Sequence, residues 1–266
     1  GADGYASVIF VVDEDALCKK FEVKNLNDVA ILVKNDQTLK LIDSALKTSH
    51  RKIVTTELEK DINPRSQLYA LLLRYFYNNS LNFQSIIEEF VEYELLSILK
   101  RTELNEVKRT IVRIPNTDPS LLVVSFQKIS EILFSNLPEG NSKKILLKTL
   151  SNPDELSSYR PIANNEIQLM TLHKSKGLEF DVVFHLNLDD WVLPAKKPTG
   201  YINKEQDLNL HYVGITRARK FCALLSSTQR TRNGLSISSA PSEFLYRNGL
   251  ERQRKNFKVD RNIVKI

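Results

Sequence analysis

The chain has 266 residues, 42% of them hydrophobic and 26% charged, which is typical of a globular protein with a sizeable buried core. A formal net charge of +6 permits a nucleic acid or an acidic membrane surface as a partner, but charge alone selects neither. The two cysteines, Cys18 and Cys222, do not fit a disulfide framework or a zinc site, and no apolar run reaches the length of a membrane span, so we expect a cytoplasmic protein with no membrane partner.

The first part of the chain alternates strand and helix patterns. Short apolar runs at 7–12, 29–33 and 52–55 are typical of buried strands. Between them, residues 13–22 and 36–46 are expected to be helical, and in the second range apolar side chains recur at helical spacing. This β-α-β-α-β order predicts a parallel sheet covered by helices.

The middle of the chain, residues 66–154, is predicted to be an all-helical insertion. Apolar stripes at helical spacing cover 68–76, 86–99, 122–133 and 145–150, and asparagine pairs or prolines separate them. We interpret the aromatic residues of these stripes as core packing rather than as ligand contacts.

The alternating pattern returns after the insertion, with strands predicted at 166–171, 182–186 and 221–226 and a helix at 208–220. We therefore expect an α/β domain made of residues 1–65 and 155–250. A basic tail at 251–266 carries six Lys or Arg and two acids. We interpret the tail as a solvated segment, and an extension that faces DNA is the alternative.

A loop rich in hydrogen-bond donors follows the strand predicted at 166–171. Its hydroxyl, imidazole and ammonium groups suit phosphate oxygens, and in parallel sheets ligands meet the carboxyl ends of strands. These donors are Thr171, His173, Lys174, Ser175 and Lys176. Gly177 permits a close backbone approach or a positive φ, and Glu179 can accept from a ribose hydroxyl or a basic partner. The residues leave an alternative open, which is an ordinary surface turn with a salt bridge.

The second candidate segment is the predicted helix at 208–220, which carries Arg217 and Arg219 on different faces. An arginine held rigidly at a domain surface can reach a phosphate across a cleft and stabilise the charge that develops in phosphoryl transfer. The alternative, which applies to most arginines on helices, is a solvated side chain.

Both segments resemble motifs of the UvrD/Rep/PcrA family of DNA helicases. Residues 167–184 are similar to its motif V, V-x-L-M-T-x-H-x-[SA]-K-G-L-E-F-x-x-V-F, and residues 212–218 match the core of motif VI, Y-V-G/A-x-T-R-A. In the family's motif VI two arginines precede this core, and here Leu208 and Asn209 take their places. The contacts of those arginines are therefore not carried over.

The resemblance implies a role for each matching residue. Thr171 and His173 are expected to contact the backbone of single-stranded DNA, together with the neighbouring donors Lys174, Ser175 and Lys176. Gly177 and Glu179 are expected at the nucleotide, and Arg217 is expected to contact its γ-phosphate as the catalytic arginine. No metal ligand is predicted in this chain.

Three shorter matches support the resemblance. Residues 186–194 resemble the family's G-x-x-x-G-x-F-P turn, where we interpret Trp191 as a packing residue. Residues 240–245 resemble its P-S-R-F-L segment, and residues 30–37 resemble A-V-L-x-R-x-N-x-Q with Lys34 in place of the arginine. The helical insertion lies where the family carries its 2B subdomain, but it is shorter and shows no family motif.

The implied fold is RecA-like, and the implied function is that of the C-terminal motor domain of an ATP-dependent 3′–5′ DNA helicase. Its partners would be single-stranded DNA, ATP with Mg²⁺, and an N-terminal RecA-like domain. The sequence contains no G-x-x-x-x-G-K-[ST] phosphate loop, which the family carries in that N-terminal domain, so we expect no ATP hydrolysis by this chain alone. The alternative is a non-catalytic helicase-like module that binds DNA or protein.

Overall fold

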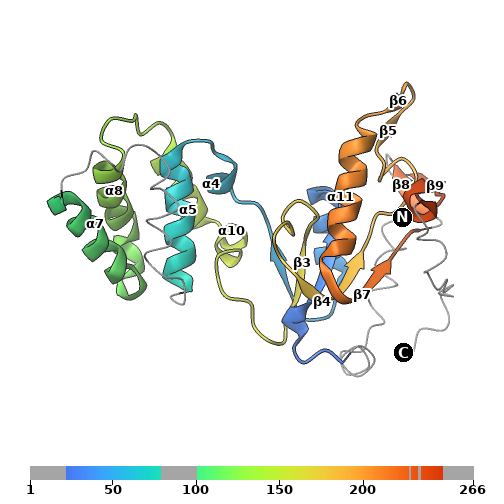
Figure 1. Ribbon diagram of the computed structural model, residues 1–266, viewed down its shortest axis with the longest axis horizontal. Coiled ribbons are helices and arrows are strands. Elements are labelled where there is room, and N and C mark those ends of the chain that lie inside the picture. The colour runs from blue at the N-terminus through green and yellow to red at the C-terminus, as the bar shows by residue number, and fades with distance from the viewer. Residues whose placement is uncertain (1–21, 79–100, 228, 233–234, 248–266) are drawn as a thin grey trace. The chain divides into compact units, whose positions relative to one another are not determined.

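The computed structural model describes residues 22–78, 101–227, 229–232 and 235–247 (Figure 1). The strand predicted at 7–12, the helical stripe at 86–99, the basic tail at 251–266 and nearly all of the helix predicted at 13–22 lie outside the described residues. The chain forms two compact units, of which one comprises Gly1–Val54 with Ile162–Ile266 and the other Thr55–Pro161.

The first unit contains a parallel five-stranded sheet, which confirms the predicted α/β fold. The strand order is β2-β3-β1-β4-β7, and every pair is parallel. In chain order the strands are β1 Val29–Val33, β2 His50–Ile53, β3 Ile167–Thr171, β4 Phe180–His185 and β7 Ala218–Leu224. Because β1 lies in the centre and is buried along its length, it carries the continuous apolar run from which it was predictable.

Helices cover both faces of the sheet. Alternate residues of β1 face opposite sides, so that Ile31 packs with Leu39 of helix α3 (Asp36–Ala45), and Leu32 belongs to the core that includes Leu210 of helix α11 (Lys204–Thr216). Asn35 caps α3 by accepting from the Thr38 amide at 2.9 Å. Smaller elements complete the unit: η1 Leu26–Asp28, β5 Lys196–Lys197, β6 Gly200–Tyr201, β8 Gln229–Arg232, β9 Leu235–Ser238 and η5 Glu243–Tyr246.

Several predicted boundaries in this unit are wrong, including those of β4 and β7, which were predicted at 182–186 and 221–226. The helix predicted at 208–220 ends at Thr216, because the amide of Phe180 donates to the Arg217 carbonyl oxygen at 2.8 Å and Ala218 then pairs with Phe180 as the first residue of β7. Arg217 and Arg219 therefore do not lie on two faces of one helix. The strand predicted at 52–55 is β2, His50–Ile53, whose polar residues reflect its position at the edge of the sheet.

The second unit is helical in its described part. Its elements are α4 Glu57–Lys60, α5 Pro64–Tyr77, α7 Arg101–Arg113, η3 Ile114–Asn116, η4 Pro119–Leu121, α8 Leu122–Leu133, α9 Ser142–Ser151 and α10 Pro153–Ser157. Tyr69 and Phe126 are fully buried and stacked, which confirms core packing for these aromatic residues. The buried Arg65 guanidinium donates to the carbonyl oxygens of Phe134 and Leu137, at 2.7 and 2.9 Å, and so caps the carboxyl end of α8.

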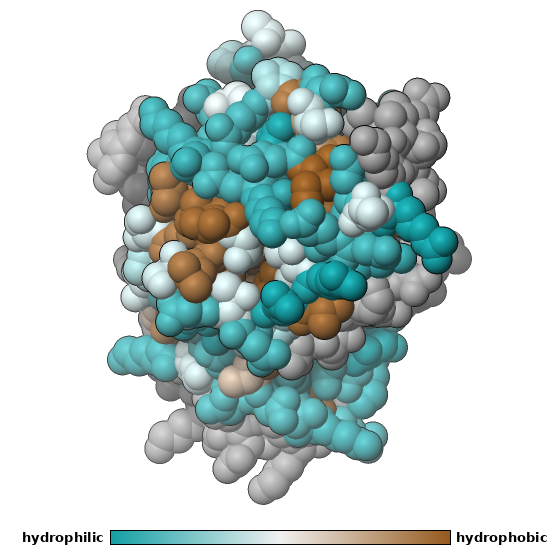
Figure 2. Space-filling model, turned by 90° about the vertical axis from the view of Figure 1, so that its left-hand side faces the viewer, coloured by the Kyte–Doolittle hydropathy of each residue, from teal (hydrophilic) through white to brown (hydrophobic). Residues whose placement is uncertain are grey.

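The helical unit includes segments on both sides of the range 66–154. Thr56 forms a capping box with Glu59, and its hydroxyl lies 2.6 Å from that of Tyr159. The buried Leu58 of α4 packs into the same core as the longer helices. Large apolar side chains also remain on the surface of this unit, namely Ile62, Val112, Leu121, Val124 and Leu147. Figure 2 shows apolar patches on a largely hydrophilic face of the molecule. Among the described residues, no helix has both the length and the apolar character that crossing a membrane requires.

Close packing between α11 and the sheet generates a testable prediction at Gly214. A Cβ atom there would lie 2.6 Å from Cδ2 of His185 and 2.7 Å from Cδ2 of Leu172. We expect Gly214→Ala to lower the free energy of unfolding by about 1–3 kcal/mol, because overpacking outweighs the higher helix propensity of alanine. Urea denaturation followed by circular dichroism measures this change. The matched control is Asn209→Ala, at an exposed position of the same helix, which should change stability little. A stabilised Gly214→Ala variant would contradict the packing argument.

Candidate functional site

The donor-rich loop is a compact turn that starts at the carboxyl end of β3. The Ser175 amide donates to the Thr171 carbonyl oxygen at 3.1 Å, and the Leu178 amide donates to that of Ser175 at 3.0 Å. Thr171 also accepts through Oγ1 from the Lys174 amide at 3.4 Å. These bonds fold residues 171–178 onto themselves, so their side chains face different directions.

Burial separates the predicted DNA contacts into two kinds. His173 and Lys176 are exposed, Lys174 is half-buried, and Thr171 lies at the border of burial. Ser175, by contrast, is fully buried and donates through Oγ to the Leu172 carbonyl oxygen at 2.8 Å. The interpretation of Ser175 as a phosphate contact is therefore corrected, because its hydroxyl closes the turn and does not face outward.

Gly177 has the conformation that its residue type suggests. Its φ of +85° lies in the left-handed region, and a Cβ atom there would meet nothing within 4 Å. The conformation, rather than lack of space, therefore favours glycine at this position. The exposed Glu179 follows two residues later and directly precedes β4.

Arg217 lies beside the end of this loop. Its Nη1 donates to the Leu178 carbonyl oxygen at 2.9 Å, and its Nε donates to that of Val213 at 3.2 Å. Among the described residues it forms no ion pair, and its side chain is half-exposed. Arg219 differs, because its guanidinium pairs with Asp181 and Asp28 at 2.7 and 2.8 Å. Of the arginines Arg217 and Arg219, Arg217 thus retains a charge that no described carboxylate neutralises.

The site residues lie at two edges of the sheet. Thr171 pairs with Val33 at the carboxyl edge, where β1 and β3 end. Glu179 and Arg217 directly precede Phe180 and Ala218, which pair at the amino edge, where β4 and β7 begin. The loop therefore runs from one edge to the other, bringing Gly177, Glu179 and Arg217 together and leaving Thr171 and His173 at its opposite end.

A buried ion pair at the carboxyl edge was not found by sequence reasoning. Lys34 donates to Asp207 Oδ1 at 2.6 Å and to the Val192 carbonyl oxygen at 2.7 Å, and Asp207 Oδ2 accepts from the Ala195 amide at 2.6 Å. The pair joins the end of β1 to the first turn of α11, the helix that ends at Arg217. The signal was Lys34, which stands in a family-like segment, but nothing in the sequence pairs it with Asp207.

The departures from motif VI have simple structural roles. Leu208 packs against the core formed by the sheet and α11, and Asn209 is exposed. Trp191, which we interpreted as a packing residue, is 39% exposed, so part of its ring reaches the surface.

Two buried histidines lie between α11 and β4. His185 Nδ1 lies 3.1 Å from the Leu186 carbonyl oxygen and must therefore carry a proton, which leaves Nε2 as an acceptor for His211 Nδ1 at 3.2 Å. Nε2 of His211 then has no hydrogen-bond partner among the described residues. Burial, together with the charge of His211, lowers the pKa of His185 to about 3, and burial lowers the pKa of His211 to about 4.

These depressed pKa values predict that acid destabilises the fold. Below the ordinary histidine pKa of about 6.5 the unfolded chain binds protons that the folded chain excludes, so stability is retained above that pH and falls between about 6.5 and 4. Urea denaturation at pH 7.5 and pH 5 measures this loss for the natural chain and for the double variant His185→Leu/His211→Phe. The natural chain should lose more stability than the variant. Equal losses would show that the two histidines do not cause the acid sensitivity.

Comparison with known proteins matches the part of the chain that contains this site to a described family. Residues 55–229, which are more than half of the chain, match the family described as "UvrD-like helicase C-terminal domain". The match includes the helical unit, the loop at 171–178 and α11.

Individual relatives match between 30% and 62% of this chain. The chain is 38% identical over 138 residues to "ATP-dependent DNA helicase Rep" of Buchnera aphidicola subsp. Baizongia pistaciae, covering 47% of this chain and 21% of the relative. It is 38% identical over 81 residues to Rep of Escherichia coli K12, covering 30% and 12%. It is 36% identical over 179 residues to "ATP-dependent DNA helicase PcrA" of Staphylococcus aureus MRSA252, covering 62% and 24%. The chain thus spans between 12% and 24% of the lengths of these relatives.

Proposed function

The chain belongs to the family of UvrD-like helicase C-terminal domains, and we propose that it is the C-terminal motor domain of an ATP-dependent 3′–5′ DNA helicase. The observation that carries this proposal is the placement of Arg217. Its guanidinium has no described carboxylate partner, and it lies beside the backbone of Leu178, between Gly177 and Glu179. The same loop begins at Thr171 and His173, so one short segment serves both a nucleotide and a DNA strand.

The amino edge of β4 and β7 fits a nucleotide phosphate. Arg217 is anchored by carbonyl oxygens and by the Thr216 hydroxyl, which hold the guanidinium in place without neutralising it. The exposed Glu179 carboxylate can accept from a ribose hydroxyl. Bound ATP supplies a phosphoryl group, and Arg217 stabilises the charge that develops on it.

The magnesium that accompanies ATP is proposed to be held by another domain. Among the described residues no group of three or more His, Cys, Asp or Glu side chains could hold a metal ion. We assign the Mg²⁺ ligands and the phosphate loop to an N-terminal RecA-like domain, which would face Arg217 across the nucleotide.

The carboxyl edge of β3 and β1 fits the backbone of single-stranded DNA. His173 and Lys176 are exposed donors, and Thr171 and Lys174 lie in the same turn. Val33, the last residue of β1, pairs with Thr171. The capped amino end of α3 follows Val33 by two residues and therefore lies near this turn. Such contacts to phosphate position a strand without reading its sequence. Closure of the nucleotide site would move these phosphate contacts along the DNA strand.

Two further assignments follow from the family. The helical unit is proposed to be a reduced counterpart of the 2B subdomain, and the protein is proposed to act in the cytoplasm. A second candidate function, a non-catalytic binding module, is favoured by Leu208 and Asn209, which replace two arginines of motif VI.

The nucleotide assignment predicts that Arg217→Ala abolishes DNA-stimulated ATP hydrolysis in the full-length protein. Loss of an arginine that stabilises phosphoryl transfer reduces turnover by about 10³–10⁵-fold. The fold should persist, because Arg217 forms no described ion pair, and circular dichroism checks this. The matched control is Arg219→Ala, which should lower thermal stability but retain turnover, because Arg219 pairs with Asp181 and Asp28. Undiminished turnover in Arg217→Ala would favour the non-catalytic module.

The DNA assignment predicts that His173→Ala weakens binding of this chain to single-stranded DNA by a similar factor for every sequence. Fluorescence anisotropy with labelled oligothymidine and with a mixed-sequence strand measures the two dissociation constants. Lys176→Ala should also reduce the slope of affinity against salt by about 0.7, because one phosphate contact is lost. Lys144→Ala, at an exposed position of α9, is the control and should bind as the natural chain does. A change in sequence preference would contradict backbone contact.

A further inference from the structure

The backbone around Trp191 has an unusual conformation for its residues. In the family-like turn G-x-x-x-G-x-F-P, the two glycine positions correspond to Asn187 and Trp191, and both have positive φ, at 65° and 71°. Asparagine tolerates this region, but for a bulky aromatic residue it is strained. Trp191, the only tryptophan of the chain, is nevertheless exposed on the surface. Complete burial in the core therefore does not account for an aromatic residue where glycine suits the backbone.

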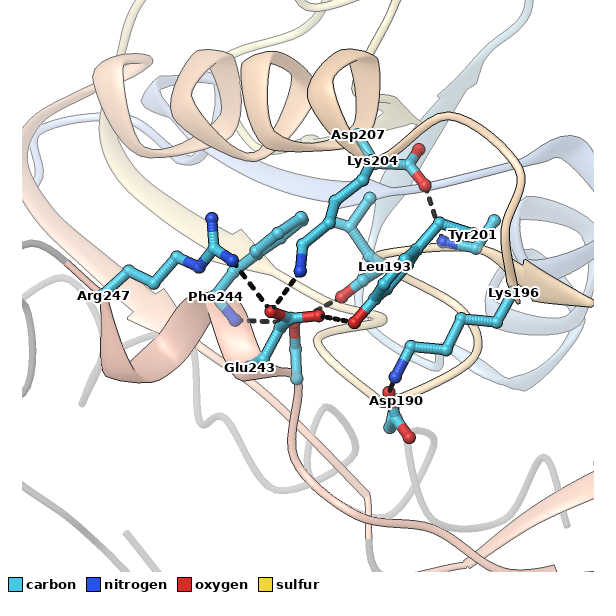
Figure 3. A network of polar contacts seen from close by, with 11 residues as sticks. Asp190, Leu193, Lys196, Tyr201, Lys204, Asp207, Glu243, Phe244 and Arg247 are labelled. Carbon is cyan, nitrogen blue, oxygen red and sulfur yellow. Dashed lines mark hydrogen bonds and ion pairs between the residues drawn. The ribbon is translucent and has the colours of Figure 1, made fainter.

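A rigid basic hairpin follows this residue. Glu243 of η5 accepts from the Tyr201 hydroxyl at 2.5 Å and pairs with Lys204 and Arg247 at 2.7 and 3.0 Å (Figure 3). Lys196 pairs with Asp190, in the loop that also contains Trp191. These contacts fix the β5–β6 hairpin to η5 and to the amino end of α11.

The surface so formed is cationic and carries exposed aromatic rings. Its basic side chains are Lys196, Lys197, Lys204 and Arg247, against the acids Asp190 and Glu243. Lys197 is exposed at the hairpin. Exposed rings come from Trp191 and Tyr246, whereas the partly exposed Tyr201 ring has Lys204 Nζ at 4.1 Å and Lys196 Nζ at 5.0 Å from its centroid. A cationic surface that carries aromatic rings suits a nucleic acid strand, whose phosphates meet the ammonium groups and whose bases stack on the rings.

This surface lies at the same edge of the sheet as the proposed DNA loop. The loop with Trp191 leaves the carboxyl end of β4, and the Val192 carbonyl oxygen accepts from Lys34 at the end of β1. The next strand end along this edge is that of β3, at Thr171, which pairs with Val33. A strand held at Thr171 and His173 can therefore continue past β1 toward Trp191 without leaving the carboxyl edge.

We infer that Trp191 and the β5–β6 hairpin form a second contact site for single-stranded DNA, in which a base stacks on Trp191 and Lys197 contacts the phosphate backbone. This inference rests on the proposed function, since it extends the strand that His173 holds. It concerns residues that depart from the family pattern, because Trp191 replaces a glycine and Glu243 replaces the arginine of P-S-R-F-L.

The single tryptophan makes the inference directly measurable. Titration of the natural chain with oligothymidine of about 16 nucleotides should quench the emission of Trp191, because a base stacks on the ring. An oligonucleotide of about 4 nucleotides, which can occupy the His173 loop alone, should bind weakly and quench less. Saturation with the longer strand without any change in emission would overturn the inference.

Substitutions separate this site from the loop. Trp191→Gly should weaken binding of the longer strand roughly tenfold, as loss of one stacked base does, while thermal stability stays equal or rises because the backbone strain is relieved. Lys197→Glu should weaken binding and reduce the salt slope, whereas Lys144→Glu, with the same charge change on exposed α9, should do neither. Natural affinity in both Trp191→Gly and Lys197→Glu would overturn the second site.

Comparison with His173→Ala distinguishes failure of this inference from failure of the proposed function. If His173→Ala weakens binding and the hairpin variants do not, the DNA loop stands and the second site is rejected. If the natural chain binds no single-stranded DNA, both are rejected. If polyglutamate displaces the long oligonucleotide from the hairpin at equal concentration of charge, the assignment to nucleic acid is rejected in favour of an acidic protein segment.

Discussion

Strands β3 and β4 are both parallel neighbours of β1, so the chain that leaves the carboxyl end of β3 must return to the amino end of β4 before it can pair again. Residues 172–179 make this return as a short turn, which the buried Ser175 hydroxyl closes. One segment therefore places His173 near one edge of the sheet and Glu179 at the other. Arg217 lies at the amino edge together with Glu179, because it directly precedes Ala218, which pairs with Phe180. Every contact proposed for DNA and for nucleotide depends on this strand order.

The same strand order explains which parts of the fold were predictable from sequence. An interior strand such as β1 is buried on both faces and shows a continuous apolar run, so its residues were predicted without error. The edge strand β2 is polar and was predicted two residues too late. The end of α11 was missed because the pairing that ends the helix links Phe180 to Ala218, which are far apart in sequence.

Resemblance selected the candidate site, but it did not give the direction of each side chain. A motif fixes the backbone of a turn, and within that turn burial decides that His173 faces solvent and Ser175 does not. The Lys34–Asp207 pair was invisible for another reason, since a single ion pair between distant residues leaves no periodic pattern. Its burial makes the pair important, because removing one partner would leave an uncompensated charge at the carboxyl edge.

The departures from the family pattern at Trp191 and Glu243 are energetically related. Tryptophan in place of glycine at 191 adds backbone strain and an exposed ring, and glutamate in place of arginine at 243 reverses a charge. Glu243 gains Tyr201, Lys204 and Arg247 as partners, which hold the neighbouring hairpin in place. The free energy gained there can offset the strain at Trp191. The surface thus combines a hairpin held by the contacts of Glu243 with a strained backbone at Trp191. Binding explains this combination better than packing does, because the residues of the family pattern would satisfy packing alone.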